Sequence, residues 1–358
     1  MEGSIEDKFL EIDGSYGEGG GQVLRTALSL SAILLKPIKL YNIRAKRPKP
    51  GLQPQHLACL RACRELTSAI TMGEELHSQE IIFSPQRRPK SGTYFFNIGT
   101  AGATSLLFQT LLYPLAFSEG GTLILQGGTH IPHSPTFHYL ERVFQPVLTA
   151  FGYKFSLSLE KAGFYPKGGG KIRASIDKTS LFKLPKFTPG FHVEKVEVIS
   201  LCSDDLPTHI IERQAQAAYE TLSKTNIQVQ ISKIKLPSSS PGTMVFVYGK
   251  DGEKHAGFTA LGKKGVPAEK VGKEAASAFL EFLQSNAQVD PYLGDQLVLP
   301  LALIVLHNNN EKFFTYTVSK ITNHLLTQAW LIPQFLDKIK IQIFGKIHEK
   351  GEVVIERA

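Results

Sequence analysis

One histidine stands where a catalytic nucleophile would be well placed. The chain has eleven histidines, and His324 lies at the start of a predicted helix, NHLLTQAWLI, with Thr322 or Asn323 as its cap. The positive end of a helix dipole disfavours the imidazolium form, so a ring nitrogen stays free to attack. The same helix end can hold the phosphate under attack. This placement indicates nucleophilic catalysis by His324.

A glycine-rich turn is a second candidate site. The run GEGGG leads directly into a predicted helix, and Glu18, Gln22 and Arg25 follow one another at helical spacing. Such a turn can offer backbone N–H groups to a phosphate, and a carboxylate beside it can bind Mg²⁺. The alternative is a tight turn whose glycines only supply positive φ angles. The residues alone leave both interpretations open.

Basic and polar side chains gather in the loop that follows the next predicted strand. Arg44 and Arg47 lie there, and Gln55 and His56 begin the helix after it. Planar guanidinium groups suit phosphate oxygens, and each charge-assisted hydrogen bond contributes about 1.5 to 3 kcal/mol. A solvated loop is the alternative.

Two further patterns could bind a nucleotide. Asp295 and Gln296 open a predicted apolar helix, where the aspartate could equally be a simple N-cap. The segment GFTALGKK has P-loop spacing, but Lys264 stands where Ser or Thr would bind Mg²⁺, and the next helix begins only after Pro267. We therefore do not predict a P-loop.

Possible metal ligands occur in two places, and neither has a standard metal spacing. His130, His133 and His138 form an H-x2-H-x4-H run, which we interpret as polar histidines of a loop. Cys59 and Cys63 fall on one face of a predicted helix without a Cys or His partner at zinc-like spacing. We expect them to be small core thiols, since three cysteines cannot form a closed disulfide framework.

The elements that would position these residues repeat along the chain. One unit is a strand, a small-residue turn, an apolar helix, a second strand, a polar loop and an amphipathic helix. Copies of it begin at residues 9 and 93, and a third covers residues 290–332. Residues 189–288 interrupt the repeat with their own strands and helices, including a helix with Ile211, Ala215, Ala218 and Leu222 on one stripe. We predict an α+β fold with an inserted α/β domain at 189–288, between large-domain segments 1–188 and 289–358.

Composition excludes some classes of protein. Of 358 residues, 42% are hydrophobic and 20% are charged, which is typical of a globular chain with a sizeable core. The longest apolar run, residues 297–306, is about half the ~20 residues that span a bilayer, so we expect no membrane segment. The first eight residues lack the pattern of a secretory signal, so we expect a cytoplasmic protein. The net charge of +8 favours a polyanionic partner.

The sequence resembles the RNA 3′-terminal phosphate cyclases over essentially its whole length. The matching segments are IDGSYGEGGGQVLRTALSLS, IRAKRPKPGLQPQHL, NIGTAGATSLLFQT, GGTHIPHSP, GFYPKGGG, ALGKKGVPAEKVG, YLGDQLVLPLAL and NHLLTQ. The resemblance implies a large domain of three repeats, each a four-stranded sheet with two helices, and a smaller domain inserted between repeats two and three. This agrees with the organisation read from the chain itself.

The resemblance also implies a reaction. The histidine of the family's H-x-x-T-N motif, here His324, would attack the α-phosphorus of ATP with Mg²⁺ or Mn²⁺ and release pyrophosphate. AMP would then pass to the RNA 3′-phosphate, and the neighbouring 2′-hydroxyl would close a 2′,3′-cyclic phosphate and expel AMP. Such phosphoryl exchanges need positioning and charge neutralisation more than a strong base.

By the same resemblance, several residues receive roles. Glu18 matches a metal and nucleotide contact, and the other nucleotide-binding residues are Gln109, Pro132, Tyr292, Asp295 and Gln296. The residues expected to bind the RNA phosphate are Gln22, Arg25, Arg44, Arg47, Gln55 and His56. Two positions depart from the family pattern, with Gln328 in place of the motif Asn and Ser134 in place of a common Ala.

Two other functions remain as hypotheses. A branch of proteins with this fold assembles ribosomal subunits without cyclase activity, but that branch lacks the nucleophilic histidine, whereas this chain has His324. The enolpyruvyl transferases use a similar repeated unit, and such an enzyme would ignore RNA and need no covalent histidine.

Overall fold

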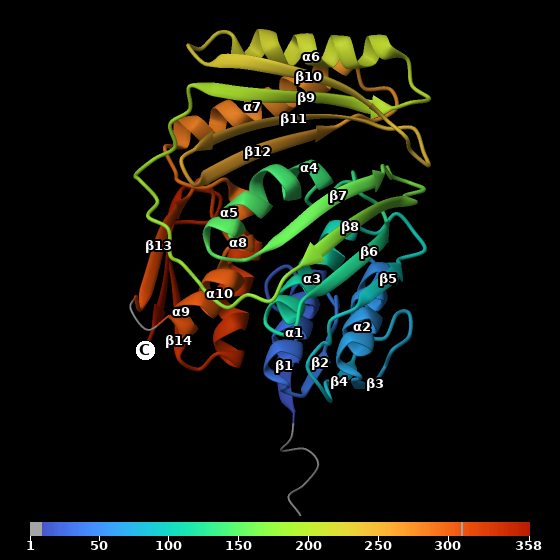
Figure 1. Ribbon diagram of the computed structural model, residues 1–358, viewed down its shortest axis with the longest axis vertical. Helices are drawn as coiled ribbons and strands as arrows, with labels where there is room; N and C mark the ends of the chain where they lie inside the picture. The colour runs from blue at the N-terminus through green and yellow to red at the C-terminus, as the bar shows by residue number, and fades with distance from the viewer. Residues whose placement is uncertain (1–8, 309–310) are drawn as a thin grey trace, which may run out of the picture.

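The computed structural model describes residues 9–308 and 311–358, which form four β-sheets with helices packed against them (Figure 1). The predicted mixed α+β class is confirmed. The first eight residues, on which the expected lack of a secretory signal rests, lie outside the described residues. No helix in the described ranges is long and apolar enough to cross a membrane.

The first sheet and its helices contain the glycine-rich turn and the basic loop. Its elements are β1 (Leu10–Asp13), α1 (Gly21–Leu34), β2 (Ile38–Tyr41), α2 (Pro54–Thr67), β3 (Ile70–Met72) and β4 (Ile81–Ser84). The strand order is β1-β2-β4-β3, with β1 parallel to β2 and the other pairs antiparallel. The glycine-rich turn therefore connects an edge strand to α1.

The second sheet has the same strand order and directions. Its elements are β5 (Thr93–Asn97), α3 (Thr104–Ala116), β6 (Gly121–Gly127), α4 (Phe137–Tyr139), a π-helical turn (Leu140–Phe144), α5 (Gln145–Ala150), β7 (Phe155–Lys161) and β8 (Gly170–Ile176). β5 runs parallel to β6, which is antiparallel to β8, and β8 is antiparallel to β7. The amphipathic helix expected at the end of this unit is one helical segment over residues 137–150, with a π turn in its middle.

The third sheet differs from the prediction of four strands. Its elements are α8 (Pro291–Gln296), α9 (Val298–His307), β13 (Phe313–Val318), α10 (Asn323–Phe335), β14 (Ile339–Phe344) and β15 (Gly351–Arg357). Within the described residues the sheet has three strands, in the order β13-β15-β14. Val289 forms a single parallel bridge to Val318, and the next residue, Asp290, already caps α8. The early start of α8 thus reduces the first strand to one residue.

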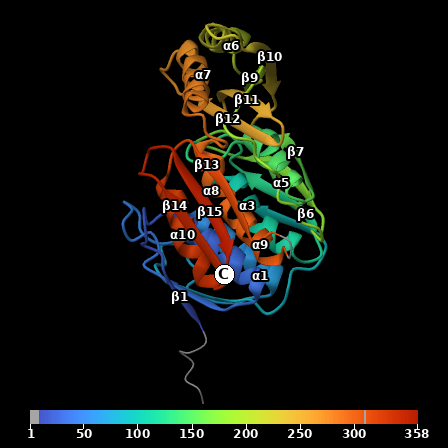
Figure 2. The same cartoon turned by 90° about the vertical axis from the view of Figure 1, so that its left-hand side faces the viewer.

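The fourth sheet comes from the interrupting segment and has a different topology. Its elements are β9 (Lys195–Ser203), α6 (Thr208–Leu222), β10 (Gln228–Leu236), β11 (Thr243–Asp251), β12 (Lys254–Leu261) and α7 (Ala268–Ser285). The order is β10-β9-β11-β12. The helical stripe predicted in α6 is buried, and a hydrophobic cluster of its own lies in this region. Figure 2 shows the region projecting from the rest of the molecule. The domain limits 189 and 288 stay a prediction.

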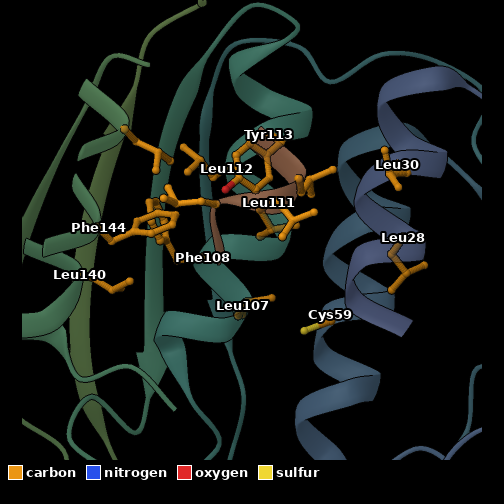
Figure 3. Close-up of a cluster of buried hydrophobic side chains, with 14 of the residues drawn as sticks. Leu28, Leu30, Cys59, Leu107, Phe108, Leu111, Leu112, Tyr113, Leu140 and Phe144 are labelled. Carbon is orange, nitrogen blue, oxygen red and sulfur yellow. The ribbon is translucent and has the colours of Figure 1, made fainter. Parts of the chain in front are cut away.

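A continuous hydrophobic core unites the other three sheets and extends to Leu201 and Phe246 in the fourth. Figure 3 shows α3 between the side chains of α1 and α2 on one side and Leu140 and Phe144 on the other. Cys59 and Cys63 are fully buried and free, as expected of core thiols. Each large apolar side chain buried here contributes about 1.5 to 3 kcal/mol.

The fourth sheet depends on its own aromatic core. Phe279 of α7 is fully buried and packs edge-on against Phe258 and Phe282. We expect Phe279→Ala to lower the free energy of unfolding by about 3 to 5 kcal/mol, because it leaves a cavity. Urea denaturation followed by circular dichroism measures this. Leu181→Ala, at a side chain that is 78% exposed, is the control and should stay within about 0.5 kcal/mol; equal losses in both variants would contradict the packing described.

Candidate active site

A cavity of about 640 Å³ lies where the repeats meet the fourth sheet. Its walls come from α1, α3, α8, α10, the loop 131–136 and β12. The predicted site residues that line it are Gln22, Arg25, Gln109, Pro132, Tyr292, Asp295, Gln296 and His324. Residues separated by some 300 positions in the sequence therefore share one cavity.

His324 enters the cavity from the first turn of α10. Thr322 is the N-cap, and its hydroxyl accepts a hydrogen bond from the Leu325 backbone N–H at 3.1 Å. Enclosure lowers the pKa of His324; Glu18 opposes this effect, while Arg25 and Arg47 add to it. The imidazole is therefore held neutral, with a lone pair available for attack.

Glu18 faces His324 from the glycine-rich turn. Gly17 and Gly19 on either side of it have φ angles of 61° and 56°, which only glycine adopts without strain. The Glu18 carboxylate accepts a hydrogen bond from the Arg47 guanidinium at 2.8 Å. Partial burial alone would raise the pKa of Glu18, but His324, the Asn323 side chain and Arg47 together lower it. Glu18 is therefore ionised beside the neutral histidine.

The other predicted phosphate-binding residues do not line the cavity, and neither does Glu18. Burial, followed by the charges of Arg25 and Arg44, lowers the pKa of His56 to about 3. Its Nδ1 accepts from the Gln53 backbone N–H at 3.1 Å, closing a capping box at the start of α2. Gln55 accepts from the Ala103 backbone N–H at 2.9 Å. Through these hydrogen bonds, His56 and Gln55 stabilise the loops around Arg25.

Helix α8 brings three predicted nucleotide contacts, Tyr292, Asp295 and Gln296, to the cavity. Asp290 is its N-cap, accepting from the backbone N–H groups of Tyr292 and Leu293 at 2.9 Å each. Asp295 lies in the last turn, so the alternative of Asp295 as an N-cap is wrong. Its carboxylate accepts from Gln22 Nε2 at 3.1 Å. Burial, and then the nearby Asp290, raise the pKa of Asp295 to about 7.

The sequence of this chain matches a known protein family. A family model described as RNA 3′-terminal phosphate cyclase matches residues 16–343, a range that contains every residue of the cavity. The chain belongs to the RNA 3′-terminal phosphate cyclase family.

Individual members of the cyclase family match over nearly their full length. The protein named RNA 3′-terminal phosphate cyclase from Gloeothece citriformis is 40% identical over 334 residues, covering 91% of this chain and 93% of that protein. Its namesake from Pyrococcus abyssi is 40% identical over 350 residues, covering 98% and 99%. The Sulfolobus acidocaldarius protein of the same name is 42% identical over 343 residues, covering 94% and 97%.

Several residues of the cyclase site were missed at the sequence level. Tyr139 lines the cavity, and its hydroxyl donates to the Asp290 carboxylate oxygens at 2.9 and 3.1 Å. Thr259 and Glu274 of the fourth sheet and its helix also line the cavity. An Asp directly before a Pro is a signal for the Asp290 cap, but no local pattern indicates that Tyr139 or the fourth sheet reaches the site.

The expectation of polar loop histidines at 130–138 is wrong for two of the three. His130 and His138 are buried, with His130 Nε2 and His138 Nδ1 3.0 Å apart. The Thr129 hydroxyl lies 2.8 Å from His130 Nδ1. Among the described residues no group of three His, Cys, Asp or Glu side chains could hold a metal ion. The pair instead fixes the base of the loop that carries Pro132.

The raised pKa of Asp295 makes stability depend on pH. Between about pH 4 and pH 7 the folded chain keeps a proton on Asp295 that the unfolded chain releases. The free energy of unfolding of the wild type should therefore fall with rising pH relative to that of Asp295→Asn, and the difference should level off above about pH 7. Urea denaturation at stepped pH measures it; parallel profiles of the two proteins would show that Asp295 titrates normally.

Proposed function

We propose that this protein uses ATP to convert an RNA 3′-terminal phosphate into a 2′,3′-cyclic phosphate, with His324 as the covalent nucleophile. The observation that carries the proposal is the neutral His324 imidazole at the rim of a nucleotide-sized cavity, facing the ionised Glu18. Membership of the cyclase family and the names of its members support the substrate and the reaction class.

The first step forms a bond between a His324 ring nitrogen and the α-phosphorus of ATP as the bond to pyrophosphate breaks. The neutral imidazole supplies the electron pair. The positive end of α10 and the guanidinium of Arg25 offset the negative charge that develops on the phosphate oxygens. The product of this step is His324 carrying AMP, with free pyrophosphate.

The next two steps use the RNA end. An oxygen of the 3′-phosphate attacks the phosphorus of AMP, and the bond to His324 breaks, which restores the free histidine. The 2′-hydroxyl then attacks the 3′-phosphorus, loses its proton, and expels AMP as the ring closes. Both exchanges depend on in-line positioning, so the residues act chiefly as a scaffold of charges and donors.

The part of the cavity lined by α8 and the loop 131–136 suits an adenosine. Tyr292 is 55% exposed while lining the cavity, so its ring is free to stack on a base, and Pro132 lies in the facing loop. Gln109 Nε2 donates to Gln296 Oε1 at 2.6 Å across this wall. Gln22 Oε1 and Gln328 Oε1 are buried without a partner in the described structure. Such unsatisfied acceptors fit a ligand that brings hydroxyl or amino donors.

The residues present suit a divalent ion that arrives with the nucleotide. Mg²⁺ usually binds one or two carboxylates together with substrate phosphates, rather than a cage of protein ligands. Glu18 is the carboxylate that would hold Mg²⁺ or Mn²⁺ in this arrangement. The bound ion would neutralise charge on the phosphates.

His324 is accessible at its helix start, so it can be replaced at little cost to folding. We expect His324→Ala to form no AMP adduct when incubated with ATP and Mg²⁺, whereas the wild type gains one AMP by intact mass. His209→Ala changes an exposed histidine at the equivalent second position of α6 and should label normally. An AMP adduct on His324→Ala would show that His324 is not the nucleophile. If the wild type binds ATP but forms no adduct, a non-catalytic ribosome-assembly factor would be favoured.

Arg44 offers charge for the RNA 3′-phosphate. Its Nε is buried without a partner among the described residues, and its pKa is lowered by burial and by Arg47, so an anion would stabilise it. Arg44→Ala should reduce kcat/KM for 3′-phosphorylated RNA by roughly 10- to 100-fold, the loss of one charged hydrogen bond. Adduct formation without RNA should persist. Arg88→Ala, which changes an exposed arginine, is the control. If wild type and Arg44→Ala had equal kcat/KM, Arg44 would be a solvated surface residue that does not bind the RNA phosphate.

A further inference from the structure

The glycine loop, residues 14–20, runs along α10 and contacts it at successive turns. At the first turn, the Asn323 side chain lies against the Glu18 carboxylate and lowers its pKa. At the second turn, Gly17 lies so close to Thr327 that a Cβ on Gly17 would be 2.5 Å from the threonine Oγ1. The loop therefore follows the helix that carries the nucleophile, and it does so with almost no side chains of its own.

At the third turn, Tyr16 stacks on Trp330. The ring centroids are 3.8 Å apart and the planes are inclined by only 7°. Tyr16 is 39% exposed, so it is a surface residue held against the helix rather than part of the core. It is the only large apolar side chain between Asp13 and Gln22. The stack is thus the one broad contact available to fix this end of the loop.

The position of Glu18 depends on where the loop is fixed. On one side, Arg47 binds its carboxylate at 2.8 Å; this guanidinium is itself about one third exposed and belongs to another loop. On the other side, the Asn323 side chain of α10 lies against it and lowers its pKa. The flanking Gly17 and Gly19 give the backbone wide conformational freedom. Without an anchor on α10, the carboxylate could leave the histidine while keeping its ion pair with Arg47.

We propose that Tyr16 and Trp330 are positioning residues whose stack anchors the glycine loop on α10 and so holds Glu18 beside His324 during adenylylation. The inference rests on the proposed function, since it concerns the first step of that reaction. Neither ring touches the reacting atoms. Their effect passes through Glu18, which makes the effect separable from a general contribution to stability.

The test is a set of variants assayed by the single-turnover rate of AMP adduct formation at saturating ATP. Tyr16→Ala should slow this rate roughly three- to tenfold, which is the change in rate expected from losing the free energy of one aromatic stack. Tyr16→Phe keeps the ring and should restore the rate. In a Glu18→Gln background, Tyr16→Ala should cause no further loss, because the residue acts through Glu18.

The chain has a single tryptophan, so its fluorescence reports directly on the stack. The emission of Trp330 should shift to longer wavelength in Tyr16→Ala and stay unchanged in Tyr16→Phe. Tyr219→Ala, at a 41% exposed tyrosine on α6, is the matched control and should leave both rate and emission unchanged.

Two results would overturn the inference while leaving the proposed function intact. One is a wild-type rate in Tyr16→Ala, and the other is a loss that is fully additive with Glu18→Gln. If the wild type forms no adduct, the proposed function fails, and this inference fails with it.

Discussion

The burial of α1 is the constraint on which the site depends. This helix is apolar on nearly all sides and packs against α2, α3 and α10, so it has one position in the core. Its first turn carries Gln22 and Arg25 to the cavity. Because α10 packs directly on α1, the first turn of α10 brings His324 to the same cavity. The meeting of two helix N-termini gives the site a positive field before any ligand arrives.

Burial and the charges of nearby arginines explain the protonation states. Arg25, Arg44 and Arg47 gather near α1, and together with burial they keep His56 and His324 neutral. Glu18, Glu274 and Asp295 bring the opposite charge. Asp295 and Glu274 line the cavity, whereas Glu18 lies outside its lining, beside His324. Glu18 is ionised because Arg47 and Asn323 lie against its carboxylate, and protonation of His324 would lower its pKa further. Burial raises the pKa of Asp295 to about 7. A polyphosphate would complete the charge balance that these side chains leave open.

Local patterns predicted the elements well, because helix and strand periodicity depend on neighbouring residues. The buried stripe of α6 and the core cysteines of α2 are examples. Contacts between distant segments could not be read in this way. His130 and His138 form a buried pair because tertiary packing selects among polar residues of equal local propensity. Tyr139 was missed for the same reason. The cap of α8 at Asp290 is different, because the Asp–Pro dipeptide signals it locally.

One buried carboxylate shows how such distant contacts build the site. Asp290 caps α8, accepts from the hydroxyl of Tyr139, and lies close enough to the Gly257 backbone in β12 of the fourth sheet for that group to lower its pKa. Burial raises its pKa to about 6, and the hydrogen bonds oppose this rise. A buried acid is costly unless its lone pairs are filled. The cavity walls must therefore come together around Asp290 for it to be satisfied, which couples the docking of the fourth sheet to the shape of the nucleotide site.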